Sequence, residues 1–154
     1  VPIPVWYPLD DSGDPATLSH PILTGVLRDE LGYDGVIVTD SLGMQGVRDK
    51  YGDAEVPVRA LLAGADQLLM SPAMDDAYSA VLDAVRSHRI APSELDAKVR
   101  RVLSLKYRRG TVAKPYADPA AVSAVVGTPA HLAAADSVTV DMGAARAFHL
   151  QVIC

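Results

Sequence analysis

Two short apolar runs, residues 35–39 (GVIVT) and 65–70 (ADQLLM), limit the possible folds of this chain more than any other feature. Continuous apolar runs of this length are typical of strands covered on both faces, and such strands belong to parallel sheets. Apolar residues at helical spacing precede, separate and follow the two runs. Strands that alternate with helices indicate βαβ units with right-handed crossovers. The sequence therefore predicts an α/β fold in which Val36–Thr39 and Gln67–Met70 are adjacent parallel strands.

The helices between the strands have recognisable ends. Ser19 is suited to cap a helix whose apolar stripe runs from Leu23 to Leu31, and Gly32 should stop that helix. A short helix around Val58–Leu62 should end at Gly64. Four further segments are predicted from the same kinds of signal: a strand at residues 4–7, a helix over residues 74–85, a helix opened by a Ser93–Asp96 capping box, and a weaker helix over residues 118–126. The pattern leaves open whether the sheet is doubly wound or part of a (β/α)₈ barrel.

Composition restricts the partners of the chain. Its 154 residues are 49% hydrophobic and 21% charged, with a formal net charge of −5. These values are typical of a soluble globular protein that is long enough for one core. The net acidity argues against nucleic acid as a partner. Six basic residues late in the chain are predicted to form a solvated helix face: Lys98, Arg100, Arg101, Lys106, Arg108 and Arg109.

Membrane and export signals are also missing from the sequence. No apolar run approaches the roughly 20 residues of a membrane-spanning helix. The first residues lack the basic and apolar regions of a signal peptide. The single cysteine, Cys154, allows no intrachain disulfide. We expect no membrane partner, and the compartment, cytoplasmic or secreted, stays open.

An acidic residue, Asp40, ends the first predicted strand. In parallel α/β folds, reactive groups gather beyond the carboxyl ends of the strands. Residues 41–55 are polar and rich in glycine, and they are predicted to form a long loop of the kind that often carries function. From its position alone, Asp40 can be a turn residue, a helix cap or a catalytic carboxylate. Thr39 should point to the opposite face and pack rather than react.

Several short motifs occur in order along residues 8–110. They are residues 15–19 (PATLS), residues 31–35 (LGYDG), residues 39–40 (TD), Met44 and residues 63–66 (AGAD). In this combination the chain resembles glycoside hydrolase family 3, and in particular its β-N-acetylhexosaminidase branch. Ser41 follows the aspartate where the β-glucosidase branch usually has a tryptophan, and this difference favours the hexosaminidase form.

The resemblance implies that residues 1–112 form the C-terminal part of a TIM (β/α)₈ barrel, and that residues 113–154 form a linker helix and a divergent tail. It implies that Asp40 is the catalytic nucleophile of a retaining glycosidase, which forms a glycosyl ester that water hydrolyses. The expected substrate is a carbohydrate with a terminal β-linked N-acetylglucosamine, and no cofactor is expected. Three residues are expected to line the sugar site, with core packing as the alternative for Met44: Ser41, Met44 and Met70.

A retaining glycosidase also needs a proton donor. In the resembled branch a histidine beside an aspartate has this role and a lysine–histidine motif holds the sugar, but neither motif occurs in this chain. The four histidines are predicted to be surface residues and to form no metal site: His20, His88, His131 and His149. A complete barrel takes about 250 residues. We therefore expect a truncated barrel whose open strand edges self-associate or pair with a complementary fragment, and an isolated chain with negligible turnover.

Three functional hypotheses follow. The first is a part of a β-N-acetylhexosaminidase that carries the nucleophile, with a β-glucosidase-type enzyme as its variant. The second is a non-catalytic truncated barrel that acts as a binding or assembly module. The third is an independent doubly wound domain in which Asp40 is a phosphoacceptor or a metal ligand. The third hypothesis requires further acidic residues at the neighbouring strand end, where the sequence has Met70.

Overall fold

The computed structural model describes residues 9–144, and the chain divides into two compact units, residues 1–112 and 113–154. The predicted strand at residues 4–7 lies outside the described residues. The assignment of the two units to a barrel portion and to a linker helix with its tail stays a prediction. The first unit contains η1 (Ala16–Leu18), η2 (Pro21–Glu30), β1 (Val38–Ser41), α1 (Gln45–Ala63), β2 (Gln67–Leu69), α2 (Met74–Arg86) and α3 (Pro92–Arg108), and the second contains η3 (Pro119–Ala121), α4 (Val122–Val125) and α5 (Pro129–Ala144).

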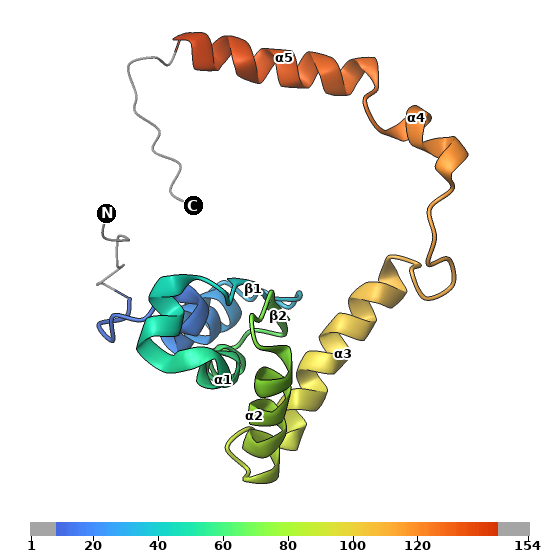
Figure 1. The fold of residues 1–154 in the computed structure, drawn as a ribbon. Coiled ribbons are helices and arrows are strands. Elements are labelled where there is room, and N and C mark those ends of the chain that lie inside the picture. Colours follow the sequence, from blue (N-terminus) through green and yellow to red (C-terminus); the bar gives the residue numbers. More distant parts are fainter. Residues whose placement is uncertain (1–8, 145–154) are drawn as a thin grey trace. The chain divides into compact units, whose positions relative to one another are not determined.

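The two strands are adjacent and parallel, as the sequence predicts (Figure 1). Val38 pairs with Gln67 and Ser41 pairs with Leu69, with an irregularity between the two pairs. The backbone N–H of Leu42 extends the ladder by donating to the carbonyl of Leu69 at 2.9 Å. α1 connects the strands and packs against α2, so β1, α1 and β2 form one βαβ unit. The first strand begins later than predicted and includes Asp40.

The prediction that helices cover both faces of these strands is wrong. Ile37 and Thr39 are buried, whereas Val38 is 48% exposed. Leu69 of β2 is also exposed. The buried side faces a core that is built from η1, η2, α1 and residues that flank the two strands: Leu18, Leu23, Ile37, Leu42, Val47, Val56, Ala60, Ala63 and Ala65. Alternate strand residues point to opposite faces, so one face meets this core while the other stays open.

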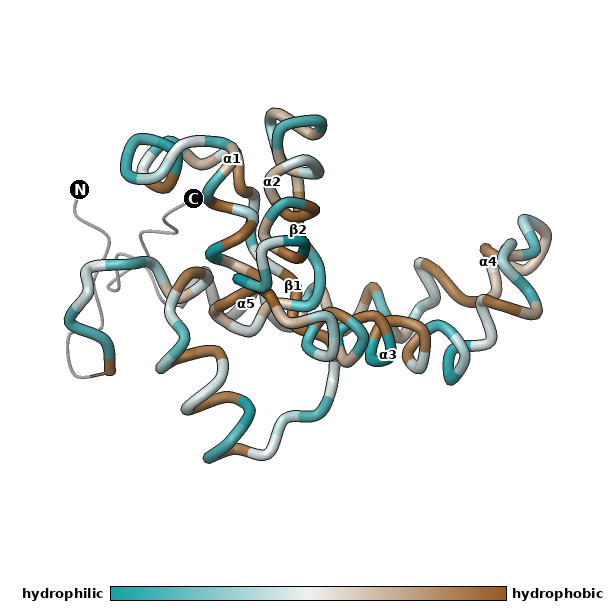
Figure 2. Tube along the Cα trace, turned by 90° about the horizontal axis from the view of Figure 1, so that it is seen from below, coloured by the Kyte–Doolittle hydropathy of each residue, from teal (hydrophilic) through white to brown (hydrophobic). Residues whose placement is uncertain are grey.

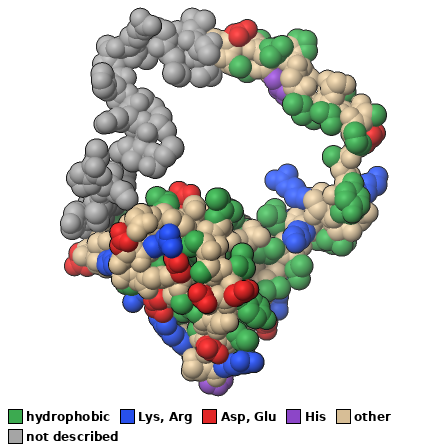
Figure 3. All heavy atoms as spheres, in the orientation of Figure 1, with side chains coloured by type: hydrophobic (Ala, Val, Ile, Leu, Met, Phe, Trp, Pro, Cys, Tyr) green, Lys and Arg blue, Asp and Glu red, His purple; other side chains and the backbone are tan. Residues whose placement is uncertain are grey.

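The strand face that none of the described helices covers predicts that the chain associates with copies of itself. Val38 and Leu69 lie on this face, and Leu103 is 55% exposed on α3, where hydrophobic residues recur along the helix (Figure 2). Hydrophobic side chains also lie among charged ones on the surface of the first unit in Figure 3. Exposed strands with apolar side chains pair readily with other chains. We expect sedimentation velocity to show concentration-dependent oligomers, and Val38→Lys to shift them toward monomers.

A matched control for this prediction is Val126→Lys. Val126 is 65% exposed in the second unit, so the substitution adds the same charge at a residue that belongs to neither strand. A stable monomer with a sharp thermal transition would contradict the expectation of self-association.

The prediction of a long loop over residues 41–55 is also wrong. The connection between β1 and α1 is only residues 42–44, and α1 then runs from Gln45 to Ala63. The helix is interrupted at Gly52, whose φ of 75° and ψ of 162° belong to a region that only glycine populates readily. Val47 and Val56 anchor the helix on either side of this interruption because both are buried in the core. The predicted stop at Gly64 is confirmed, with a φ of 123°.

The helix before β1 follows the sequence signals only in part. η2 begins at Pro21, and the Ser19 hydroxyl accepts a hydrogen bond from the backbone N–H of Ile22 at 3.3 Å, although His20 occupies the capping position. η2 is a π-helix over its whole length, and the hydrogen bond of 2.9 Å from Leu31 N–H to the carbonyl of Val26 continues this wide winding at its end. Leu31 is 71% exposed, so the apolar stripe ends before it.

The third predicted helix differs in its start and in its charged face. α3 begins at Pro92 after Ala91, so Ser93 lies inside the first turn and does not cap the helix. The solvated-face prediction is wrong for two of its basic residues. Lys98 is only 6% exposed, and burial lowers the pKa of its ammonium group. Arg101 pairs with Asp66, and the Nε–Oδ1 distance is 2.8 Å.

Asp66 joins four segments of the first unit. Its side chain is fully buried and also pairs with Arg28 of η2, with an Nη2–Oδ2 distance of 2.5 Å. The backbone N–H of Ile37, just before β1, donates to the same oxygen at 2.8 Å. Asp66 lies directly before β2, so its carboxylate ties η2, the approach to β1, β2 and α3 together.

The second unit contains helices in its described part. The predicted weak helix over residues 118–126 is present as η3 and α4, and Asp118 Oδ1 caps it by accepting from the backbone N–H of Ala120 at 2.9 Å. In the part of the chain that the structure describes, no helix is both long enough and apolar enough to cross a membrane.

Candidate functional site

Asp40 is held at the carboxyl end of β1 with its side chain exposed. Its Oδ1 accepts a hydrogen bond from the backbone N–H of Ser41 at 2.7 Å. Thr39, one position earlier, points into the core, and its Oγ1 accepts from the backbone N–H of Leu69 at 3.0 Å. The prediction that Thr39 points to the face opposite Asp40 and packs there is confirmed, while its lack of a role in the reaction stays a prediction. The alternation along β1 therefore fixes Asp40 on the open face of the sheet.

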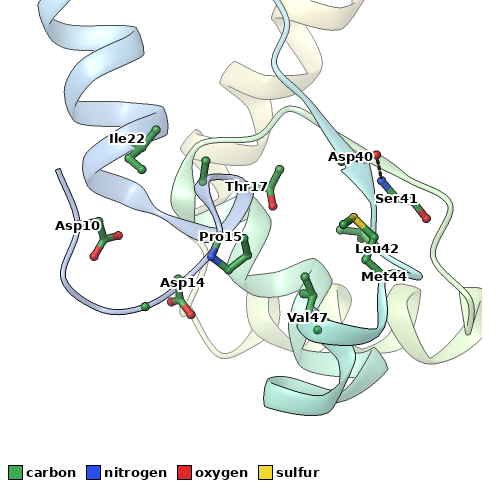
Figure 4. A pocket seen from close by; sticks show the side chains of 13 residues that line it. Asp10, Asp14, Pro15, Thr17, Ile22, Asp40, Ser41, Leu42, Met44 and Val47 are labelled. Atoms are coloured by element: carbon green, nitrogen blue, oxygen red, sulfur yellow. Dashed lines mark hydrogen bonds between the residues drawn. The ribbon is translucent and has the colours of Figure 1, made fainter. Parts of the chain in front are cut away.

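A cleft of about 420 Å³ lies beside Asp40 (Figure 4). In the figure, Asp40 and Ser41 lie on one side, while Asp10, Asp14 and Ile22 lie on the other. Most of the wall is apolar, with a few polar groups between the apolar side chains, as is typical of small-molecule sites. The cleft is lined by Asp10, Gly13, Asp14, Pro15, Ala16, Thr17, Ile22, Asp40, Ser41, Leu42, Met44, Gly46 and Val47.

The structure brings three of the four predicted site residues to this cleft. Asp40, Ser41 and Met44 line it, whereas Met70 does not. Ser41 also supports the turn into α1, because its Oγ accepts from the backbone N–H of Gly43 at 3.2 Å. Met70 is 69% exposed and has a positive φ of 52°. Its side chain lies outside the lining of the cleft, although its carbonyl oxygen is close to Gly43, in the turn between Ser41 and Met44.

Sequence reasoning missed the acidic residues of the loop before η1. Asp10 and Asp14 line the cleft, although no site residue is predicted for their segment from the sequence. The Ser19 hydroxyl donates to Asp10 Oδ2, and this hydrogen bond, with one from the Ser12 backbone, lowers the pKa of Asp10. The signal in the sequence that could have indicated Asp10 and Asp14 is the neighbouring PATLS motif, because Pro15, Ala16 and Thr17 of this motif also line the cleft.

Asp14 is tied to α1. The ammonium group of Lys50 lies 2.7 Å from its Oδ1, and the Tyr51 hydroxyl donates to the same oxygen at 2.5 Å. The hydrogen bond to Asp14 raises the pKa of Lys50, so this cation stays charged at neutral pH. The loop and α1 therefore form one wall of the cleft together.

Three of the predicted surface histidines are confirmed, because His20, His88 and His131 are exposed. His149 lies outside the described residues. None of the three described histidines lines the cleft beside Asp40. Among the side chains that the structure describes, those of residues 9–137, no group of three or more His, Cys, Asp or Glu is arranged to hold a metal ion.

The geometry is suited to nucleophilic or acid–base catalysis by one carboxylate, that of Asp40 on β1. Asp40 is presented on a strand end, one of its oxygens accepts a backbone hydrogen bond, and an apolar cleft lies next to it. This arrangement can hold a small molecule with its reactive atom close to a carboxylate oxygen.

Comparison with known proteins gives a consistent result. The profile of the glycosyl hydrolase family 3 N terminal domain matches residues 5–105. Beta-hexosaminidase A of Pseudoalteromonas piscicida is 32% identical over 126 residues, which cover 76% of this chain and 21% of that protein. A beta-N-acetylglucosaminidase/beta-glucosidase of Cellulomonas fimi is 29% identical over 124 residues, which cover 80% of this chain and 22% of that protein.

The solved structures agree with the sequence comparisons. A glycoside hydrolase family 3 beta-N-acetylglucosaminidase from a Paenibacillus species superposes with a TM-score of 0.65 and 43% sequence identity, covering 68% of this chain and 20% of that one. The chain thus spans about a fifth of the length of these relatives. Because the family profile matches most of the chain, this protein belongs to glycoside hydrolase family 3 and carries part of its N-terminal domain.

Proposed function

We propose that this chain is the nucleophile-bearing part of a retaining β-N-acetylhexosaminidase. The observation that carries the proposal is the placement of Asp40, an exposed carboxylate at the carboxyl end of a parallel strand beside an apolar cleft, in a chain of glycoside hydrolase family 3. The carbohydrate substrate is a glycoside with a terminal β-linked N-acetylglucosamine. The names of two relatives, a beta-hexosaminidase and a beta-N-acetylglucosaminidase structure, support this choice.

In the proposed reaction, Asp40 attacks the anomeric carbon and the bond to the leaving group breaks. Oδ1 of Asp40 already accepts the Ser41 N–H, so Oδ2 is the candidate attacking oxygen. The attack forms a glycosyl ester on Asp40, and water then hydrolyses the ester and restores the carboxylate. Met44 and Ser41 contribute to the wall against which the sugar rests.

The proton donor of the first step is proposed to come from outside the described residues. The described histidines are exposed and lie away from the cleft lining. The chain would then supply the last part of a (β/α)₈ barrel, and the other parts of the barrel would supply the acid/base residue and the groups that hold the sugar.

A β-glucosidase activity is the second candidate. The Cellulomonas relative carries both activities in its name. The substrates of the two candidate activities differ at C2 of the sugar, where the acetamido group of N-acetylglucosamine replaces the hydroxyl group of glucose.

The test uses a chimera in which residues 8–110 replace the matching segment of the Paenibacillus enzyme. We expect kcat/KM for 4-nitrophenyl N-acetyl-β-glucosaminide to exceed that for the β-glucoside by about 10–100-fold, the range over which pocket contacts usually discriminate. An equal or reversed ratio favours the β-glucosidase. If the chimera folds but hydrolyses neither compound while the parent enzyme is active, the non-catalytic hypothesis is favoured.

A further inference from the structure

The loop of residues 10–17 supplies much of the cleft wall that faces Asp40 (Figure 4). The Ser19 hydroxyl, beyond η1, donates to Asp10 Oδ2 at the start of the loop, and the other side-chain hydrogen bonds within the loop are short-range. The Ser12 N–H donates to Asp10 at 2.9 Å, and the Asp14 N–H donates to the Ser12 hydroxyl at 3.1 Å. Such turns shape the loop but do not fix its distance from α1 or from Asp40.

Leu18 of η1 belongs to the same buried cluster as Val47 and Val56 of α1, and the loop ahead of η1 is joined to α1 by side-chain hydrogen bonds from two consecutive residues of the helix. Lys50 Nζ lies 2.7 Å from Asp14 Oδ1 and donates to the Ser12 carbonyl at 3.3 Å. The Tyr51 hydroxyl donates to Asp14 Oδ1 at 2.5 Å. Among the described residues, these are the side-chain hydrogen bonds that link residues 10–17 to α1. The Asp14 side chain is 10% exposed, so its contacts are largely shielded from water.

Tyr51 is held firmly enough to act as an anchor. Its ring packs against the hydrophobic core, and the guanidinium carbon of Arg59 lies 3.8 Å from the ring centroid. Gly52, the next residue, breaks the helical path, so Tyr51 ends the first part of α1 while Arg59 reaches it from the second part. Stacking of a guanidinium group on an aromatic ring is favourable and fixes the orientation of the ring.

We propose that Tyr51 and Lys50 act as positioning residues: they clamp Asp14 and thereby set the width of the cleft between the loop of residues 10–17 and Asp40. The consequence for substrate binding rests on the proposed glycosidase function, whereas the clamp itself does not. Neither side chain lines the cleft, so Tyr51 acts through Asp14, and Lys50 acts through Asp14 and the Ser12 carbonyl.

The first test measures the clamp in the 154-residue chain without reference to catalysis. Tyr51→Phe removes the hydroxyl but keeps the ring, and we expect amide hydrogen exchange of residues 10–19 to accelerate by about fivefold, as the loss of one hydrogen bond allows. Peroxide oxidation of Met44, which lines the cleft, should accelerate by about twofold or more in the same variant, because a loosened loop gives the oxidant better access to the Met44 sulfur. Met70, outside the cleft, should react at an unchanged rate and serves as an internal reference.

Tyr78→Phe is the matched control. Tyr78 is 69% exposed on α2, and none of the hydrogen bonds among the described residues joins its hydroxyl to the loop, so the same atomic change should leave both rates unchanged. Unchanged exchange of residues 10–19 in Tyr51→Phe, or equal acceleration at Met44 and Met70, would overturn the clamp.

The second test measures the catalytic consequence in the chimera. Tyr51→Phe should raise KM for the aryl glycoside about fivefold, with kcat changed less than twofold, because the variant alters the fit of the substrate and not the nucleophile. Asp14→Ala and the Asp14→Ala/Tyr51→Phe double variant should have the same KM, since Tyr51 acts through Asp14.

The outcomes separate the two proposals. Additive effects of the two substitutions, or an unchanged KM in a chimera that hydrolyses the substrate, would overturn the positioning role. A chimera without activity before any substitution contradicts the proposed function, while the exchange and oxidation rates still decide on the clamp.

Discussion

Replacement of Asp40 by Ala in the active chimera should lower kcat on an aryl N-acetylglucosaminide by about 10⁴-fold or more, because loss of a nucleophile removes the covalent route altogether. The cleft should persist, since the Asp40 side chain is exposed and the hydrogen bond that it makes is to the adjacent backbone. The measurement is steady-state hydrolysis, with unfolding curves to show that the variant is folded. Asp76→Ala, which removes an exposed carboxylate from α2, should leave activity unchanged.

The covalent step gives a second readout. A 5-fluoro glycosyl donor should trap an ester, and peptide mapping should place the label on Asp40. Azide should partly restore turnover of Asp40→Ala by attacking from the vacated side, which gives a glycosyl azide of inverted configuration. Label on another carboxylate would refute the assignment. Robust hydrolysis by the 154-residue chain alone, abolished by Asp40→Ala, would instead show that the chain carries its own proton donor.

Replacement of Asp66 by Ala should destabilise the first unit by about 3–5 kcal/mol, the usual result of removing one partner from a buried ion pair. The substitution leaves Arg28, whose side chain is 13% exposed, without its carboxylate. It also removes the acceptor for the Ile37 N–H and the partner of Arg101. The free energy of unfolding is measured by urea titration of the 154-residue chain, and α3 should lose protection from hydrogen exchange first.

The matched control is Asp53→Ala. Asp53 also pairs with an arginine, Arg48, and the Nε–Oδ1 distance is 2.6 Å, but both side chains are partly exposed. Exposed ion pairs contribute little to stability, so this variant should keep its unfolding midpoint. If the two variants unfold at the same urea concentration, Asp66 does not hold the four segments together.

The stability of this cluster bears on the active site. Asp66 fixes the backbone of Ile37 immediately before β1, and β1 carries Asp40. The pairing of Val38 with Gln67 begins next to this contact. The carboxylate of Asp66, directly before β2, therefore helps to fix the strand register that places Asp40 at the end of β1.

The features that the sequence determined by itself are those with a local signal. The order of strands and helices, the parallel pairing and the stop at Gly64 follow from apolar periodicity and from the conformational freedom of glycine. The position of Asp40 at the end of β1 was predicted in the same way, since a single residue ends a continuous apolar run. The family motifs predicted Ser41 and Met44 in its neighbourhood, and both line the cleft.

Tertiary structure alone decided the features that depend on distant partners. Residues 45–55 have a polar pattern that indicates a loop, yet burial of Val47 and Val56 on either side of Gly52 makes them helical. Lys98 and Arg101 have the pattern of a solvated face, but Asp66, more than 30 residues earlier, draws Arg101 into an ion pair. Asp14 enters the cleft wall because Lys50 and Tyr51, 36 and 37 residues away, bind it. The position of a charged side chain depends on the partner that folding brings close to it. Hydrophobic periodicity in the sequence does not show which residue that partner is.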